Sequence, residues 1–228
     1  MAPAPTVTRP TRLTGPQRRE QILDVTKAMV GERGFHGISI DAVARRAGIT
    51  RPVVYGHFDN MAGLLQALLE REGARAIDQL MVLLPKPDSG QEPGEVLLGG
   101  MRAFLEAVRD EPVTWRLVLM PPEGTPETLR ERTVLVRRAV TDRLAALSPE
   151  VMSGAGATPP PDAELAALTM QAVAEDAARL LLQDAERYPL ARLMAHTEWI
   201  LGRLGLVQRL NRSPGTRGRD IPASPRAE

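Results

Sequence analysis

Apolar residues recur at intervals of three and four along most of the chain between residues 16 and 210. This spacing places them on one face of an α-helix, and no convincing stretch alternates apolar and polar residues as a half-buried strand does. The pattern is clear in the leucines of 60–83 and in the apolar residues of 94–109. The sequence therefore predicts an all-α fold with about nine helices.

Prolines and glycines mark where these helices begin and end. The expected longer helices cover residues 16–32, 60–83, 94–109, a segment starting near 125–126, 162–186 and 189–210, and a short helix is expected at 113–120. Pro126 suits the first turn of its helix. Residues 148–161 are rich in Ser, Gly and Pro and predict a loop. The ends, 1–15 and 211–228, read as a flexible basic arm and a disordered tail.

The composition excludes several classes of chemistry. The chain has no cysteine, which rules out a disulfide scaffold, thiolate catalysis and cysteine-based metal sites. Its three histidines lie far apart, and neither of its two lysines follows the glycine of a phosphate-binding loop. No serine stands in a nucleophile elbow. We therefore expect no metal, no cofactor and no enzymatic activity.

Hydropathy and charge bear on location and partners. No apolar run approaches the length of a membrane span, and the N-terminus lacks the apolar core of a signal peptide, so we expect a cytoplasmic protein. Residues 1–60 carry a net charge of +4, residues 61–210 of −5 and residues 211–228 of +2. A basic head on an acidic body favours contact with a polyanion, although ordinary scatter gives the same pattern.

Residues 39–47 have the features of a short helix. Ser39 can cap its N-terminus, and Asp41 lies favourably in the first turn. Val43 and Ala47, four residues apart, face one side. Ala44 is small enough to let a second helix approach closely.

The residues that follow predict a turn and a second short helix. Gly48 supplies the tight turn, and Ile49 fills the angle between the helices. Thr50 can cap the next helix, and Pro52 is tolerated in its first turn. Two short helices joined by about three residues with a glycine form a helix-turn-helix, whose second helix offers its N-terminal residues to the major groove.

Residues 17–72 resemble the DNA-binding domain of the TetR family of transcriptional regulators. The matching segments are Ile22 to Phe35, Ser39 to Ala44, Ala47 to Ile49, Thr50 to Phe58 and Leu64-Leu65. The ending Tyr55-Gly56-His57-Phe58 after a short helix is the most telling feature. The resemblance implies a helix-turn-helix domain over 16–60 and an effector-binding and dimerisation domain over 61–210.

The expected DNA-contacting residues are Ser39, Arg45, Thr50, Arg51, Pro52, Val53, Tyr55 and His57. Arg51 can bind guanine O6 and N7, or it contacts only phosphate or water. The resemblance implies phosphate contacts for Tyr55 and His57, whose alternatives are a half-buried hydroxyl and a cap at the helix end. Val53 could pack on a thymine methyl group, whereas Val54 faces the core.

Two positions depart from the family pattern. The family often has a phosphate-binding lysine at the start of its fourth helix, where this chain has Asp59-Asn60-Met61. Gly56 replaces a bulky residue between the tyrosine and the histidine. Both predict fewer backbone contacts per half-site. A basic arm that follows the minor groove could compensate, using Arg9, Arg12, Arg18 and Arg19.

In the body, the resemblance implies a homodimer through the last two helices and an effector pocket between the others. The expected pocket residues are Met101, Phe104, Leu105, Trp115, Leu117, Met120, Leu135 and Leu168, and plain core is the alternative for each. Glu175 and Asp176 interrupt a small, apolar helix. They either orient a polar or cationic ligand or, as we prefer, pair with arginines at the dimer surface.

These expectations combine into a ligand-responsive repressor. It would bind a palindromic DNA operator as a dimer and be released by a small, largely apolar effector. The alternative is an activator, or a regulator controlled by a partner protein instead of a small molecule. An all-helical dimeric enzyme is a rival from another class, against which the missing catalytic motifs argue.

Overall fold

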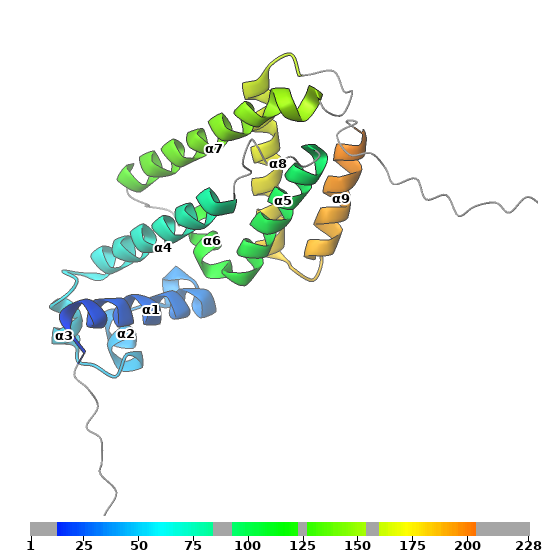
Figure 1. Ribbon diagram of the computed structural model, residues 1–228. Coiled ribbons are helices and arrows are strands. Elements are labelled where there is room, and N and C mark those ends of the chain that lie inside the picture. Colours follow the sequence, from blue (N-terminus) through cyan, green and yellow to red (C-terminus); the bar gives the residue numbers. More distant parts are fainter. Residues whose placement is uncertain (1–12, 84–92, 123–126, 154–159, 204–228) are drawn as a thin grey trace, which may run out of the picture.

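The computed structural model describes residues 13–83, 93–122, 127–153 and 160–203, and these ranges contain nine α-helices, one short 3-10 helix and no strand (Figure 1). The all-α class expected from the periodicity is confirmed. The tail at 211–228 and the arginines Arg9 and Arg12 lie outside the described residues. None of the helices in these ranges is both long and apolar enough to cross a membrane.

The N-terminal head consists of α1 (Gly15–Arg33), a 3-10 turn (Phe35–Gly37), α2 (Ile40–Arg46) and α3 (Arg51–Tyr55). Helix α1 begins with a capping box, in which Thr14 accepts from the backbone N–H of Gln17 and the Gln17 side chain accepts from that of Thr14. The chain leaves α1 at Gly34, whose φ of 68° lies in the left-handed region that glycine adopts readily. Arg18 and Arg19, expected to belong to a basic arm, thus lie within α1.

Helix α4 (Met61–Leu83) connects the head to the body. Its first half belongs to the core of the head, where Leu64 and Leu68 are fully buried. Its second half belongs to the core of the body through Ala76. Figure 1 shows α4 running from beside α1 into the middle of the molecule, between α1 and α7, and it contacts α5, α6 and α7 of the body.

The body contains α5 (Pro93–Asp110), α6 (Pro112–Leu119), α7 (Glu127–Ser153), α8 (Ala163–Gln183) and α9 (Leu190–Arg203). Helix α7 packs mainly along α8, and α5 packs on both α8 and α9. The short α6 lies between the two parts, because it packs against α4 and α1 as well as against α5 and α8.

The observed helix ends differ from the sequence expectation in the body. Helix α7 continues through Pro149 to Ser153, where a loop over 148–161 was expected. A proline removes one helical hydrogen bond at a cost of about 3 kcal/mol, which packing along a neighbouring helix can outweigh. Helix α9 is helical up to Arg203, and its expected end at 210 lies outside the described residues.

Candidate nucleic-acid interface and internal cavity

The turn between α2 and α3 is held by the residues that the sequence singled out. Ser39 caps α2, since its hydroxyl accepts from the backbone N–H of Ala42 at 3.2 Å. Gly48 has a φ of 66°, and the backbone N–H of Ile49 donates back to Ala44 at 2.9 Å. Ile49 packs against the core of the head. These contacts fix the angle between the two short helices.

Thr50 occupies the cap position of α3, but its side chain makes no capping hydrogen bond, contrary to the sequence expectation. A capping hydroxyl accepts from the second or third helical N–H. Here the second residue is Pro52, which has no N–H, and the N–H of Val53 donates to the backbone carbonyl of Thr50 at 3.0 Å. The Thr50 hydroxyl is therefore exposed and not engaged in a cap.

Helix α3 turns one face to the core and another to solvent. Val54 is completely buried, as expected. Val53 and Tyr55 keep 38% and 52% of their surface exposed, although both carry large apolar groups. Ser39, Arg45, Arg51 and Pro52 are exposed too, and His57 is half-buried. All the residues expected to contact DNA thus have surface that a ligand can reach.

Arg51 has a partner within the head that the sequence did not reveal. Its Nε and one terminal nitrogen both contact the carboxylate of Asp41, at the start of α2. A guanidinium carries more N–H donors than this pair uses, so its remaining edge is free for a further acceptor. Nearby, Arg46 is paired with Glu32 at 2.5 Å, whereas Arg45 is exposed.

Where the family often has a lysine, at the start of α4, this chain has a local cap. The Asn60 side-chain oxygen accepts from the backbone N–H of Gly63 at 2.9 Å. Arg19, on α1, stacks over the ring of Phe58 at 4.6 Å. The residues after α3 thus contribute packing and a helix cap, and they do not add the positive charge that a lysine would supply.

A buried carboxylate joins the head to the body. Glu72 on α4 is completely buried, and it pairs with Lys27 of α1 at 2.9 Å. It also accepts from the hydroxyl of Thr114 on α6 at 2.5 Å and from its neighbour Arg71 at 2.9 Å. Burial raises the pKa of Glu72, but the hydrogen bonds from Thr114 and Lys27 and the charges of Lys27 and Arg71 outweigh it, so the pKa lies below its usual value.

The body contains a cavity of about 560 Å³ that is partly open to solvent. Its wall is mostly apolar and comes from α4 to α9. Of the residues that the sequence proposed for a pocket, Met101, Phe104, Trp115 and Leu117 line it. Phe104 and Trp115 meet edge to face, with ring centres 5.1 Å apart. The volume and the apolar wall are typical of a site for a small molecule.

The other four proposed pocket residues are not in this wall. Leu105 is fully buried in the core of the body, one position along α5 from Phe104, and Met120 packs against the same core. Leu135 and Leu168 are 69% and 45% exposed. The helical spacing of apolar residues does not tell whether a given side chain lines the cavity, packs in the core or lies on the outer surface.

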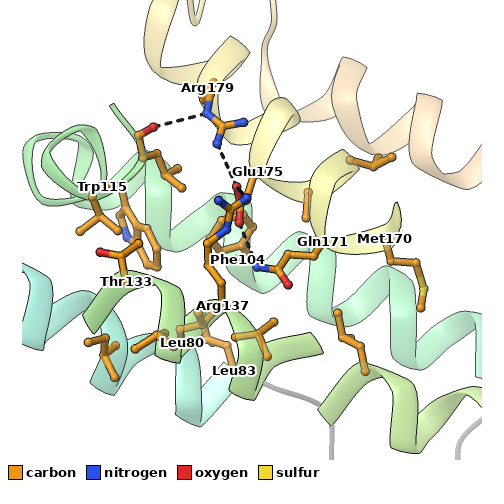
Figure 2. A pocket seen from close by; sticks show the side chains of 18 of the residues that line it. Leu80, Leu83, Phe104, Trp115, Thr133, Arg137, Met170, Gln171, Glu175 and Arg179 are labelled. Carbon is orange, nitrogen blue, oxygen red and sulfur yellow. Dashed lines mark hydrogen bonds and ion pairs between the residues drawn. The ribbon is translucent and has the colours of Figure 1, made fainter. Parts of the chain in front are cut away.

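Charged side chains meet in one part of the cavity wall, as Figure 2 shows. Glu175 of α8 accepts from Arg137 of α7 at 2.6 Å and from Arg179 of α8 at 2.9 Å. Its second oxygen accepts from Gln171 at 3.0 Å. Glu175 therefore pairs with arginines of its own chain inside the cavity, and not at the outer surface that the sequence favoured. Asp176 is exposed.

No group of His, Cys, Asp and Glu side chains among the described residues is arranged to hold a metal ion. The site therefore consists of two parts. One is the exposed face of α2 and α3, and the other is the cavity of the body, whose mostly apolar wall includes Arg137 and Arg179.

A sequence profile described as "Bacterial regulatory proteins, tetR family" matches residues 22–68. The HTH-type transcriptional activator FasR of Mycolicibacterium smegmatis is 24% identical over 173 residues, which cover 76% of each chain. An uncharacterised HTH-type transcriptional regulator of Mycobacterium tuberculosis is 32% identical over 107 residues, 46% of this chain and 52% of the other.

A TetR-family transcriptional regulator from Streptomyces coelicolor has a solved structure that superimposes with a TM-score of 0.60. It is 26% identical, and the match covers 84% of this chain and 82% of that one. The profile lies on the helix-turn-helix, and the structural match extends over the body. Together with the geometry of α2 and α3, these similarities show that the chain belongs to the TetR family and is a transcriptional regulator.

Proposed function

We propose that the protein is a ligand-responsive repressor that binds a palindromic operator as a dimer and is released by a small, largely apolar effector. Residues 16–60 would bind DNA, and residues 61–210 would hold the effector and form the dimer. The contact with DNA is assigned to the exposed residues of α2 and α3, with Arg51 reading a base and Tyr55 and His57 holding phosphates.

The observation that carries this proposal is that the same helices contribute to the core of the DNA-binding head and to the wall of the cavity. Helix α4 contributes Leu64 and Leu68 to the core of the head, and Leu69 and Ile77 further along it line the cavity. Leu117 of α6 belongs to the core of the head and also lines the cavity. A molecule that displaces α4 or α6 therefore moves the packing of the DNA-binding head directly.

The dimer is assigned to α8 and α9 because their outer faces are unusually apolar. Leu165 and Leu168 of α8 are 60% and 45% exposed and lie outside the cavity wall, and Trp199 of α9 is 50% exposed. Exposed apolar side chains of this size, gathered on two helices, favour an interface with another protein surface. In a dimer of this kind, the separation of the two heads decides whether both reach adjacent major grooves.

Coupling requires that the effector bind the released form more tightly than the DNA-bound form. Typical coupling free energies are about 1–3 kcal/mol, or roughly 5–150-fold in affinity. The alternative output is activation, which the name of the relative FasR, an activator, favours specifically. Control by a partner protein is the other alternative, and it predicts that no small molecule changes the affinity for DNA.

A binding selection from genomic DNA with the purified protein, at a stated salt concentration, tests the proposal, since affinity depends strongly on salt. We expect a short palindrome. Transcription in vitro from the selected promoter then separates repression from activation. We expect Arg51→Ala to reduce discrimination at one base pair of each half-site by about 1–3 kcal/mol, with Arg138→Ala on α7 as the control. An unchanged sequence preference in Arg51→Ala would refute the assigned role of this side chain.

A further inference from the structure

The charged residues in the cavity wall are not balanced. Arg137 and Arg179 share the single carboxylate of Glu175, so this cluster carries a net charge of +1. The wall has two other charged residues. Arg130 pairs with Glu127 at 3.5 Å. Glu70 is exposed, and its carboxylate accepts a hydrogen bond from Gln66 at 3.0 Å. The positive surplus therefore lies between α7 and α8.

Glu175 is poorly placed to receive a cationic ligand. Both of its oxygens already accept hydrogen bonds, one from the two arginines and one from Gln171. Gln171 is held in this orientation because its own oxygen accepts from Thr141 at 2.7 Å. Only 8% of Glu175 is exposed, so an incoming cation would have to displace an arginine from a buried carboxylate.

The two arginines, in contrast, keep unused donors. Within the described residues, Arg137 donates through one nitrogen, to Glu175, and Arg179 donates to Glu175 and to the carbonyl of Leu119 at 3.3 Å. A guanidinium has more N–H groups than these contacts use. The side chains are 53% and 33% exposed, so a ligand can reach them (Figure 2).

Trp115 gives a second, independent observation. The residue is 2% exposed and lines the cavity, and its indole N–H is buried with no acceptor among the described residues. Buried donors in proteins are nearly always paired, so an unpaired one in a cavity wall calls for an acceptor from outside the chain. The ligand thus needs an oxygen or a similar acceptor in addition to apolar surface.

We infer that the cavity takes an amphipathic carboxylate: an apolar chain against the leucines and aromatic rings, and an acid group beside Arg137 and Arg179. The acid group brings the charge of the arginine cluster to zero and accepts charge-assisted hydrogen bonds from the unused guanidinium donors. This inference deepens the proposed function, on which it rests, by naming the chemical class of the effector.

Three probes with the same chain and different head groups test the inference: dodecanoate, dodecan-1-ol and dodecylammonium. Their binding to the full-length protein is measured by calorimetry below the concentrations at which they form micelles. We expect dodecanoate to bind about tenfold more tightly than the alcohol, because hydrogen bonds to a charged group are roughly twice as strong as neutral ones. Dodecylammonium should bind most weakly.

Variants assign that preference to residues. Arg137→Met keeps an apolar stem and should reduce dodecanoate affinity about fivefold while leaving the alcohol within about twofold, as loss of one charge-assisted contact predicts. Arg138→Met, one residue along α7 at an exposed position outside the wall, is the matched control and should change neither. Trp115→Phe should weaken both acid and alcohol, since it removes the donor and keeps the ring. Circular dichroism checks that each variant is folded.

The inference is overturned if dodecylammonium or the alcohol binds as well as dodecanoate, if none of the three binds, or if Arg137→Met keeps the full preference for the acid. The effect on DNA is measured separately, with the selected operator. If dodecanoate binds with the expected preference but leaves operator affinity unchanged, the ligand class stands and the proposed release from DNA fails. If the alcohol and the acid bind equally and both release DNA, the proposed function stands and the inference fails.

Discussion

Two buried glutamates, Glu72 and Glu175, lie in regions whose balance of positive and negative charge differs. At the head–body junction, Glu72 contacts Lys27 and Arg71, and these cations contact further carboxylates: Glu111 for Lys27, and Glu20 and Asp24 for Arg71. A third cation, Arg75, also contacts Glu72, at 3.4 Å. In the cavity wall, Arg137 and Arg179 share a single acidic partner among the described residues, Glu175. The four carboxylates at the junction thus outnumber its three cations, whereas the cavity wall keeps a cationic surplus. The first arrangement suits a fixed joint, and the second suits a site for an anion.

The largest expected effect on the free energy of unfolding comes from a substitution at the head–body junction. Glu72→Gln keeps the size of the side chain but removes the charge that Lys27 and Arg71 face. Removing one partner of a buried ion pair costs about 3–5 kcal/mol, and the remaining acidic partners place this case at the lower end, about 3 kcal/mol. Urea denaturation gives the free energy of unfolding. Asp78→Asn, at an exposed position of the same helix, is the control and should change it by less than about 0.5 kcal/mol.

The contribution of the Glu72 carboxylate to stability should also depend on pH. The pKa of Glu72 is lowered in the folded protein, so its stabilising contribution is complete above the pKa in the unfolded chain, about 4.3. That contribution is lost as the pH falls through the lower, folded value. The difference in unfolding free energy between the wild type and Glu72→Gln should therefore be largest near neutral pH and shrink below about pH 4. A difference that stays constant down to pH 3 would contradict this assignment.

Close packing at the junction predicts a smaller effect. A Cβ added at Gly31 of α1 would lie 2.7 Å from Cγ2 of Val113 at the start of α6. Valine is stiff about χ1, so Gly31→Ala forces the helices apart, at a typical cost of about 1–3 kcal/mol. Better helix propensity returns up to about 1 kcal/mol.

A double-mutant cycle with Val113→Ala measures this contact. The coupling free energy should be about 1 kcal/mol, within the range found for residues in contact. Additive effects of the two substitutions would mean that α1 and α6 do not press on each other at this point, and the route proposed from the cavity to the head would lose one of its contacts.

Sequence reasoning predicted the head better than the body, and the reason is the range of the interactions. The cap at Ser39 and the positive φ of Gly48 depend on residues within one turn, so the sequence alone is enough to predict them. The missing cap at Thr50 is local too: Pro52 lacks the N–H that the hydroxyl would accept from, and this could have been deduced.

The contacts of the body involve residues far apart in sequence. Thr114 meets Glu72 from 42 positions away, and Arg137 meets Glu175 from 38 positions away. One signal for Glu72 was nevertheless present, because it lies four residues after Leu68 on the apolar face of its helix. A charged residue at such a position calls for a buried partner, but periodicity alone does not identify Lys27 as that partner.

The smallest expected effect on stability is the one that best separates the two glutamates. Glu175→Gln removes a charge whose arginine partners remain 53% and 33% exposed, so solvent compensates and the free energy of unfolding should fall by less than about 1 kcal/mol. The same substitution raises the positive surplus of the wall, so dodecanoate should bind a few-fold more tightly and dodecan-1-ol unchanged. If Glu175→Gln instead destabilises the protein as much as Glu72→Gln, the arginine cluster is a second structural joint. A gain in acid affinity with little loss of stability would show that the two carboxylates, although both are buried and paired with cations, have different roles.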